Sequence, residues 1–257
     1  MTGIDQYAYT SPFSGVHPGE KILLAIMTML VVLGLDSALV SSLVLLVMTA
    51  LILLPGRVPC RIYLRLLFIP LVFLLVGCLS VAVLIQSEPS GLIVSLRAGA
   101  YWIGVSGLSL YSSLVLLLRC LACLACMYFL ALTTPVIQIV YVLRRIKLPP
   151  AFVEVMGLIY YAIFDFLATA GEMCLAQNSR CGYNSFAASM RSLSTLAFNL
   201  FIKFLHRSNQ SYDALLARGF TGSLQVLEES FSWQNRNIIA IVGFNAILVI
   251  VKTYGGG

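Results

Sequence analysis

The chain has 257 residues, of which 60% are hydrophobic and only 10% are charged, whereas soluble globular domains carry about 25% charged residues. This composition excludes an ordinary soluble domain and is typical of a membrane protein with several spans. The net charge of +6 does not indicate nucleic acid as a partner, because an excess of Lys and Arg in so apolar a chain is typical of cytoplasmic loops.

The first twenty residues are polar and lack the basic start and apolar run of a cleavable signal peptide, so we expect the N-terminus to be retained and cytoplasmic. Among the seven cysteines, Cys120, Cys123 and Cys126 lie three residues apart. They occur inside an apolar helical pattern with no fourth ligand nearby, so we interpret them as packing residues and not as a metal or iron–sulfur site. The odd number of cysteines also argues against a disulfide framework.

Two short apolar runs follow the N-terminal segment, at residues 22–35 and 38–54. Each is shorter than the roughly 20 residues that a helix needs to cross a bilayer. One continuous helix over both runs would be about 50 Å long, so the sequence predicts two short or tilted helices joined by a tight turn at residues 34–37. The alternative, a single long helix, would reverse the orientation of every later span.

Three arginines, Arg57, Arg61 and Arg65, follow at a spacing of four, which predicts a short helix with all three on one side. Bases beside a membrane exit mark the cytoplasmic face. Residues 66–86 are long and apolar enough for a third span. The loop at residues 87–107, with one base and an interfacial Tyr-Trp pair, is then external.

The fourth span, residues 108–132, contains Arg119 close to its middle. A central Arg costs about 2.5 to 3.5 kcal/mol on insertion scales, so it should face other helices or a wet cavity, or extend to the interface. We favour a structural role for Arg119, in an ion pair or bound to a free carbonyl. A role on a transport path is the alternative.

The segment at residues 133–236 contains an ambiguous apolar run, residues 151–177, which is interrupted by Glu154, Asp165 and Glu172. If this run crossed the membrane, most of the bases after it would be extracytoplasmic, against the positive-inside rule. We therefore predict a helix that is cytoplasmic or lies at the interface, where the three acids can face water or basic partners.

Further helices are predicted at residues 193–206, with an amphipathic pattern, and at residues 211–218. Residues 238–251 form a short last span. In this topology most of the 16 Lys and Arg residues lie inside, and only Arg97 and Lys252 lie outside. That asymmetry predicts about five spans, with the N-terminus inside and the C-terminus outside.

Two of these helices end in Arg followed closely by Gly, at residues 179–182 and 217–219. An Arg in the last turn complements the negative end of the helix dipole, and a Gly just beyond it permits a left-handed cap. A single ending of this kind is ordinary capping. Two of them in one helical cytoplasmic segment are less common, and we look for function there.

These features resemble the T component, the transmembrane coupling subunit, of energy-coupling factor (ECF) transporters, and especially its cobalt and nickel branch (CbiQ and NikQ type). The resemblance covers nearly the whole chain and includes the opening His17-Pro18-x-x-Lys21, the stretch at residues 133–149 and the two Arg endings. It implies an all-α polytopic membrane protein with about five transmembrane helices and a helical cytoplasmic coupling domain, arranged as an L.

The resemblance implies three regions: residues 1–132 with the N-terminal cytoplasmic segment and four spans, residues 133–236 with the coupling helices, and residues 237–257 with the last span and tail. It also implies that the two endings dock into grooves on two ATP-binding-cassette (ABC) ATPases. In the first ending, Gly182 stands one place later than the family pattern has it. The implied coupling residues are Ser179, Arg180, Cys181, Ala217, Arg218 and Gly219.

By the same resemblance, the chain transmits ATPase movements to a substrate-binding (S) membrane subunit for cobalt ions, in the bilayer of a bacterial cytoplasmic (inner) membrane. It has no Gly-x-x-x-x-Gly-Lys-Ser/Thr motif, so we do not expect an enzyme, and no His/Cys/Asp cluster suited to Co(II) or Ni(II), so we expect no metal site or cofactor. The same role in nickel or vitamin uptake is an alternative, as is a self-contained carrier or channel.

Overall fold

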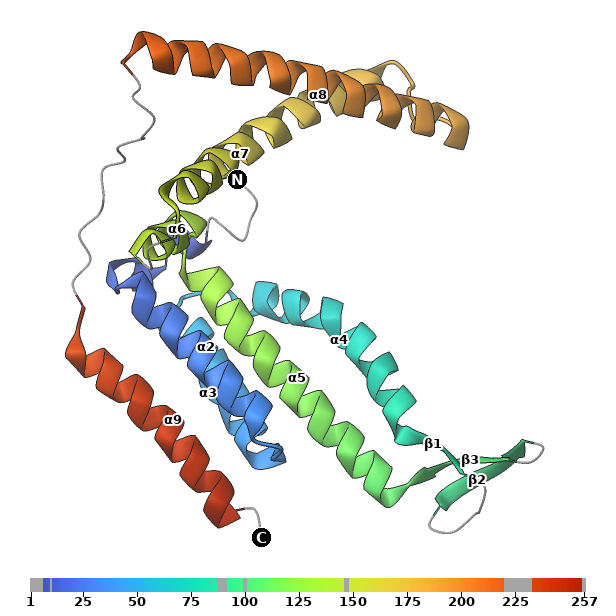
Figure 1. The fold of residues 1–257 in the computed structure, drawn as a ribbon. Coiled ribbons are helices and arrows are strands. Elements are labelled where there is room, and N and C mark those ends of the chain that lie inside the picture. The colour runs from blue at the N-terminus through green and yellow to red at the C-terminus, as the bar shows by residue number, and fades with distance from the viewer. Residues whose placement is uncertain are drawn as a thin grey trace. The chain divides into compact units, whose positions relative to one another are not determined.

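The computed structural model describes residues 7–9, 11–86, 92–98, 101–145, 148–219 and 233–255, and most of these residues are helical (Figure 1). The chain divides into two compact units. The first, which we call the bundle unit, comprises Thr2–Pro135 and Ser230–Gly257. The second, the central unit, is Val136–Glu229.

The bundle unit is organised around one long helix, α5, which packs against α2, α3 and α4, while α9 packs on α2 and α3. Its core is formed by small and aliphatic side chains of α2, α3 and α5, among them Val32, Met48 and Ala125, together with the ring of Phe129. The helices of this unit are η1 (Pro12–Gly15), α2 (Pro18–Gly34), α3 (Ala38–Leu53), α4 (Cys60–Ala82), α5 (Gly107–Thr133) and α9 (Asn235–Gly255).

The two short apolar runs form two separate helices, as predicted, with a turn between Gly34 and Ala38. At 1.5 Å per residue, the 17 residues of α2 and the 16 of α3 are each about 25 Å long. The 27 residues of α5 extend over about 40 Å. The α2–α3 turn therefore lies beside the middle of α5 and not beside its end.

Among the described residues, four helices are long and apolar enough to cross a membrane: α4, α5, the helix at Ala151–Ser179 and α9. These helices confirm the prediction of an all-α, polytopic membrane protein. The helix α9 is longer than the predicted run at residues 238–251, because polar residues continue it at both ends. The prediction of a separate short helix with three arginines is wrong. Arg61 and Arg65 belong to the first turns of α4, and Arg57 precedes it with a φ of 51°.

A small antiparallel sheet includes part of the predicted loop, and the external side of that loop stays a prediction. The sheet consists of β1 (Val83–Gln86), β2 (Leu92–Ala98) and β3 (Tyr101–Ser106), in the order β1-β3-β2. The three strands are rich in Val, Ile, Leu and aromatic residues, which favour extended backbone. Because β1 takes the last four residues of the predicted third span, that span ends at Ala82.

The central unit contains three helices, α6 (Val136–Arg145), α7 (Pro150–Ser179) and α8 (Phe186–Ala217). The prediction of two helices within the range of α8 is wrong, since α8 is continuous over 32 residues. The run of Ser, Asn and Gln at residues 208–211 contains no Pro or Gly to end a helix. The limits of the predicted coupling region at residues 133–236, and its cytoplasmic location, stay predictions.

An aromatic pair and an ionic pair are among the contacts between α7 and α8. The rings of Phe166 and Phe204 meet edge to face, with centroids 6.3 Å apart. The Nε atom of Arg207 lies 2.8 Å from Oδ2 of Asp165. Asp165, which interrupts the apolar pattern of α7, therefore has a basic partner on α8.

Candidate functional site

The first Arg ending closes α7 with a left-handed cap. Arg180 is the C-cap, and Cys181 after it has a φ of 59°. The N–H of Cys181 donates to the Asn178 carbonyl over 3.0 Å, and the N–H of Gly182 donates to the Gln177 carbonyl over 2.9 Å. This pair of bonds satisfies carbonyls of the last turn that have no partner within the helix. Cys181 thus occupies the left-handed position that usually belongs to Gly.

The second ending has the same backbone conformation. Arg218 is the C-cap of α8, and Gly219 follows with a φ of 79°. The N–H of Arg218 donates to the Leu215 carbonyl over 3.1 Å and that of Gly219 to the Leu216 carbonyl over 3.0 Å. Cys181 therefore corresponds in position to Gly219, and the extra residue before Gly182 does not change the cap.

Gly182 has a different task, which is to allow a close approach between the chain segments around the turn. A Cβ atom on it would lie 2.9 Å from the Gln177 carbonyl oxygen and 2.7 Å from Ser192 Oγ. Ser192 Oγ donates to the Gly182 carbonyl over 2.8 Å, and Gln177 Nε2 donates to the Ser192 carbonyl over 3.0 Å. The hydroxyl of Tyr183 donates to Gln177 Oε1 over 2.7 Å. These bonds hold the first ending of α7 against the start of α8.

The guanidinium groups of Arg180 and Arg218 are exposed, and neither has a hydrogen bond or ion pair with the residues that the structure describes. Each ending therefore presents a planar group with five N–H donors. Apolar side chains in the last two turns of both helices are also exposed, including Leu175 at 70% exposure and Leu216 at 50%. A free Arg beside apolar side chains is typical of the energetically important part of a protein–protein interface.

The two endings lie at opposite ends of α8. The first immediately precedes this helix, and the second closes it (Figure 1). At 1.5 Å per residue, the 32 residues of α8 separate them by about 48 Å. One small binding pocket cannot hold both arginines, so the arrangement suits two separate docking grooves.

Arg119 is paired with an acid that the sequence analysis did not connect to it. Its Nη1 donates to Oδ1 of Asp36, in the turn between α2 and α3. Because α2 and α3 are short, this turn reaches the level of Arg119 on α5. The contact favours the structural alternative for Arg119, and its role stays a prediction.

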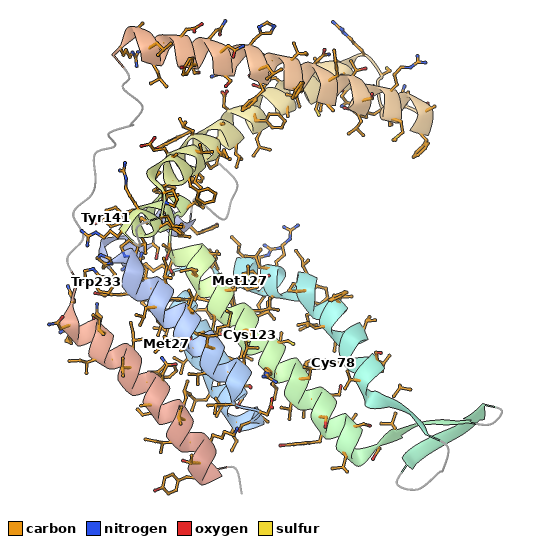
Figure 2. The ribbon with its side chains drawn as sticks, in the orientation of Figure 1. Met27, Cys78, Cys123, Met127, Tyr141 and Trp233 are labelled. Atoms are coloured by element: carbon orange, nitrogen blue, oxygen red, sulfur yellow. The ribbon has the colours of Figure 1, made fainter. Side chains whose placement is uncertain are left out.

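The cysteines of α5 lie among packing contacts. Cys126 is buried, with its sulfur 3.5 Å from Oγ1 of Thr28 in α2, and Cys120 and Cys123 are partly buried. Figure 2 labels Cys123 on α5. Within the described residues, no group of three or more His, Cys, Asp and Glu side chains is placed to hold a metal ion.

Comparison with known proteins finds a matching protein family and several relatives. The family model described as cobalt transport protein, CbiQ, matches residues 11–228, which is most of the chain. The cobalt transport protein CbiQ of Salmonella typhimurium is 29% identical over 88% of this chain and 100% of its own length. A fused cobalt transport protein CbiMQ of Methanocorpusculum labreanum is 31% identical over 95% of this chain but 41% of its own length. An uncharacterized protein of Methanocaldococcus jannaschii is 27% identical over 96% of this chain and 91% of its own.

The left-handed conformation of Cys181 predicts that Cys181→Gly stabilises the protein. A non-Gly residue there costs roughly 1–2 kcal/mol, which exceeds the entropy that Gly loses on folding. We expect the midpoint of thermal unfolding in detergent to rise by about 2 °C. The matched variant Gly219→Ala should lower it. An unchanged or lower midpoint for Cys181→Gly would show that the thiol makes a stabilising contact that outweighs the backbone strain.

If Arg119 has a structural role, its charge is needed only to neutralise the charge of Asp36. Either Arg119→Gln or Asp36→Asn alone leaves an unpaired charge near the apolar region and should reduce the yield of folded protein several-fold. The double variant should recover both yield and cobalt uptake, measured by size-exclusion chromatography and by uptake in cells. Recovery of yield without uptake would instead assign Arg119 to the transport path.

Proposed function

This chain belongs to the cobalt transport protein family CbiQ, and we propose that it is the transmembrane coupling subunit of an ECF-type importer for cobalt ions. In this role it hydrolyses no ATP. It passes the movement of two ABC ATPase subunits to a membrane subunit that binds the cobalt ion. The family supports a multi-pass membrane component of cobalt transport, and the coupling role is the step beyond it.

The observation that carries the proposal is the pair of matching Arg helix ends. Both have the same cap, both expose an Arg without a partner among the described residues, and α8 separates them by about 48 Å. Guanidinium groups bind planar acceptors in a fixed geometry, and burying one at an interface makes its loss cost a few kcal/mol. Two equal helix ends suit two equal partners, as a pair of ATPases would provide.

The contacts inside the central unit would let these ends act together. The Gln177, Gly182 and Ser192 bonds hold the end of α7 against the start of α8. Near the middle of both helices, Asp165 and Arg207 form an ion pair. A displacement of either Arg end is therefore passed along α8 and α7, and an approach of the two ATPases changes the tilt of these helices.

The cobalt ion is cargo, and its binding belongs to a partner. The CbiMQ relative carries the names CbiM and CbiQ in one fused protein, so a CbiM-like membrane subunit is the expected partner. The described residues of this chain hold no group of metal-ligand side chains. A nickel ion would be handled by the same coupling machinery with a different substrate-binding subunit.

The proposed location is a bacterial cytoplasmic membrane, with the N-terminus and the central unit in the cytoplasm. The helix α7 decides this topology, because its length and composition would also permit it to span the membrane. If it did, the bases of α8 would be external, which the positive-inside rule disfavours. Exposed cysteines near the end of α7 make the two topologies distinguishable.

Labelling with a membrane-impermeant maleimide tests the topology. We expect Cys174 and Cys181 to react in inside-out vesicles and to be protected in intact cells, because both thiols are exposed and belong to the unit that we propose to be cytoplasmic. The variant Cys174→Ser/Cys181→Ser identifies their share of the signal, and exposed Cys60 serves as the cytoplasmic reference. Labelling of Cys181 in intact cells would mean that α7 crosses the membrane.

Charge reversal of both endings tests the coupling role. The variant Arg180→Glu/Arg218→Glu should insert normally, but it should recover about a hundredfold less ATPase subunit in a detergent pull-down, since each buried Arg contributes a few kcal/mol. Cobalt uptake should fall with it. The matched control is Lys203→Glu, an exposed base in the middle of α8, which should retain both activities. Wild-type uptake by the double variant would refute the assignment of these sites.

A further inference from the structure

A five-residue stretch at the start of α2, His17-Pro18-Gly19-Glu20-Lys21, has no part in the function proposed above. Its three polar side chains are nearly fully buried: His17 and Glu20 are 2% exposed and Lys21 is 3% exposed. Burial of a charged group is costly unless partners replace water. The partners of Glu20 and Lys21 therefore show what the stretch is for.

Lys21 binds the end of α5. Its Nζ donates to the carbonyl oxygen of Thr133, the last residue of that helix, over 3.1 Å. A cation at this place complements the negative end of the helix dipole and satisfies a carbonyl that has no partner within the helix. Lys21 precedes the apolar run of α2, and desolvation lowers its pKa to about 8, so its ammonium group is still charged at pH 7.

Glu20 binds the start of α9. Its Oε1 accepts the backbone N–H of Gln234 over 2.7 Å, and its Oε2 accepts Asn237 Nδ2 over 2.8 Å. Gln234 immediately precedes α9, where the first N–H groups have no acceptor within the helix. A carboxylate at this place complements the positive end of the dipole. The two neighbouring charges of α2 thus bind helix ends of opposite polarity.

The other residues of the stretch bring the chain before α9 to the same point. The His17 Nδ1 accepts the Gly19 N–H over 3.0 Å, and the His17 ring lies on the indole of Trp233, with centroids 4.2 Å apart. A Cβ atom on Gly19 would approach Trp233 Cη2 to 3.0 Å. Gly at this position therefore leaves the space that the indole occupies.

The ends of α5 and α9 are also the two points at which the central unit is attached. The chain leaves the bundle unit after Pro135 and returns to it at Ser230. From this we infer that Glu20 and Lys21 are positioning residues that fix both attachment points of the central unit to a single turn of α2. The inference rests on the proposed coupling role. A movement that reaches either attachment point then displaces α2, α5 and α9 together.

The test first breaks the hydrogen bond between the side chains of Glu20 and Asn237. It then restores the bond by exchanging which of the two side chains is the donor and which is the acceptor. Asn237→Asp places two carboxylates against each other and should separate α9 from α2. Adding Glu20→Gln makes the amide the donor and the new carboxylate the acceptor, which restores the bond. Glu20→Gln alone is the control, because the Asn237 amide can turn to present its oxygen to it.

The assay uses the whole importer, purified with its ATPases and substrate-binding subunit and reconstituted in liposomes. Cobalt uptake and ATP hydrolysis are measured together. We expect the Asn237→Asp importer to keep its bound ATPases and their ATP hydrolysis, while uptake per ATP falls about tenfold. This is the expected effect of losing the charge-assisted bond between Glu20 and Asn237. The double variant and the control should transport within about twofold of wild type.

Three results would overturn the inference. If Asn237→Asp transports as much cobalt per ATP as wild type, the bond does not transmit movement. If the same preparation still contains bound ATPases, the proposed coupling role is unaffected by that result. A loss of uptake together with a lower thermal unfolding midpoint and aggregated elution would assign Glu20 to folding alone. If wild type itself recovers no ATPases, the coupling role fails first, and the inference fails with it.

Discussion

The bundle unit depends on the pairing of three charges, of which Glu20 and Lys21 are buried and Arg119 is partly buried. Each is matched to a group of opposite charge or to a helix end: Arg119 to Asp36, Lys21 to the end of α5, and Glu20 to the start of α9. In an apolar medium such a pairing is specific, because an unpaired alternative costs several kcal/mol. The apolar faces of the helices could pack in more than one register, and these polar contacts select one of them.

The central unit is held together by different means. Of the residues in α8, all of which the structure describes, only Leu200 is buried, and the helix contacts α7 through a few polar and aromatic pairs. Its surface carries many exposed apolar side chains, such as Phe186 at 84% exposure. A unit of this kind has little core of its own, and much of its surface is available for partners.

Sequence patterns were sufficient where a single local signal decides the structure. The apolar runs located α2, α3 and α5, and the Arg-Gly pattern located both helix ends. They were insufficient where the outcome depends on distant residues or on competing local signals. No periodicity connects Glu20 to Asn237, which lies 217 residues away, or Arg119 to Asp36. The strands were not predicted, because a count of charged residues indicates the side of the membrane on which a loop lies and not whether its backbone is extended. The left-handed Cys181 was missed because that conformation favours Gly.

The exposure of α8 has a consequence for how this chain exists in a cell. An isolated helix gains little from its own hydrogen bonds, and its ends open first. Ligands that bind only the ordered form stabilise that form by mass action. Partners that hold the two ends of α8 would therefore also preserve its order. Synthesised without them, the subunit would expose an opening helix to proteases, and its abundance would follow that of the complex and not that of its own messenger RNA.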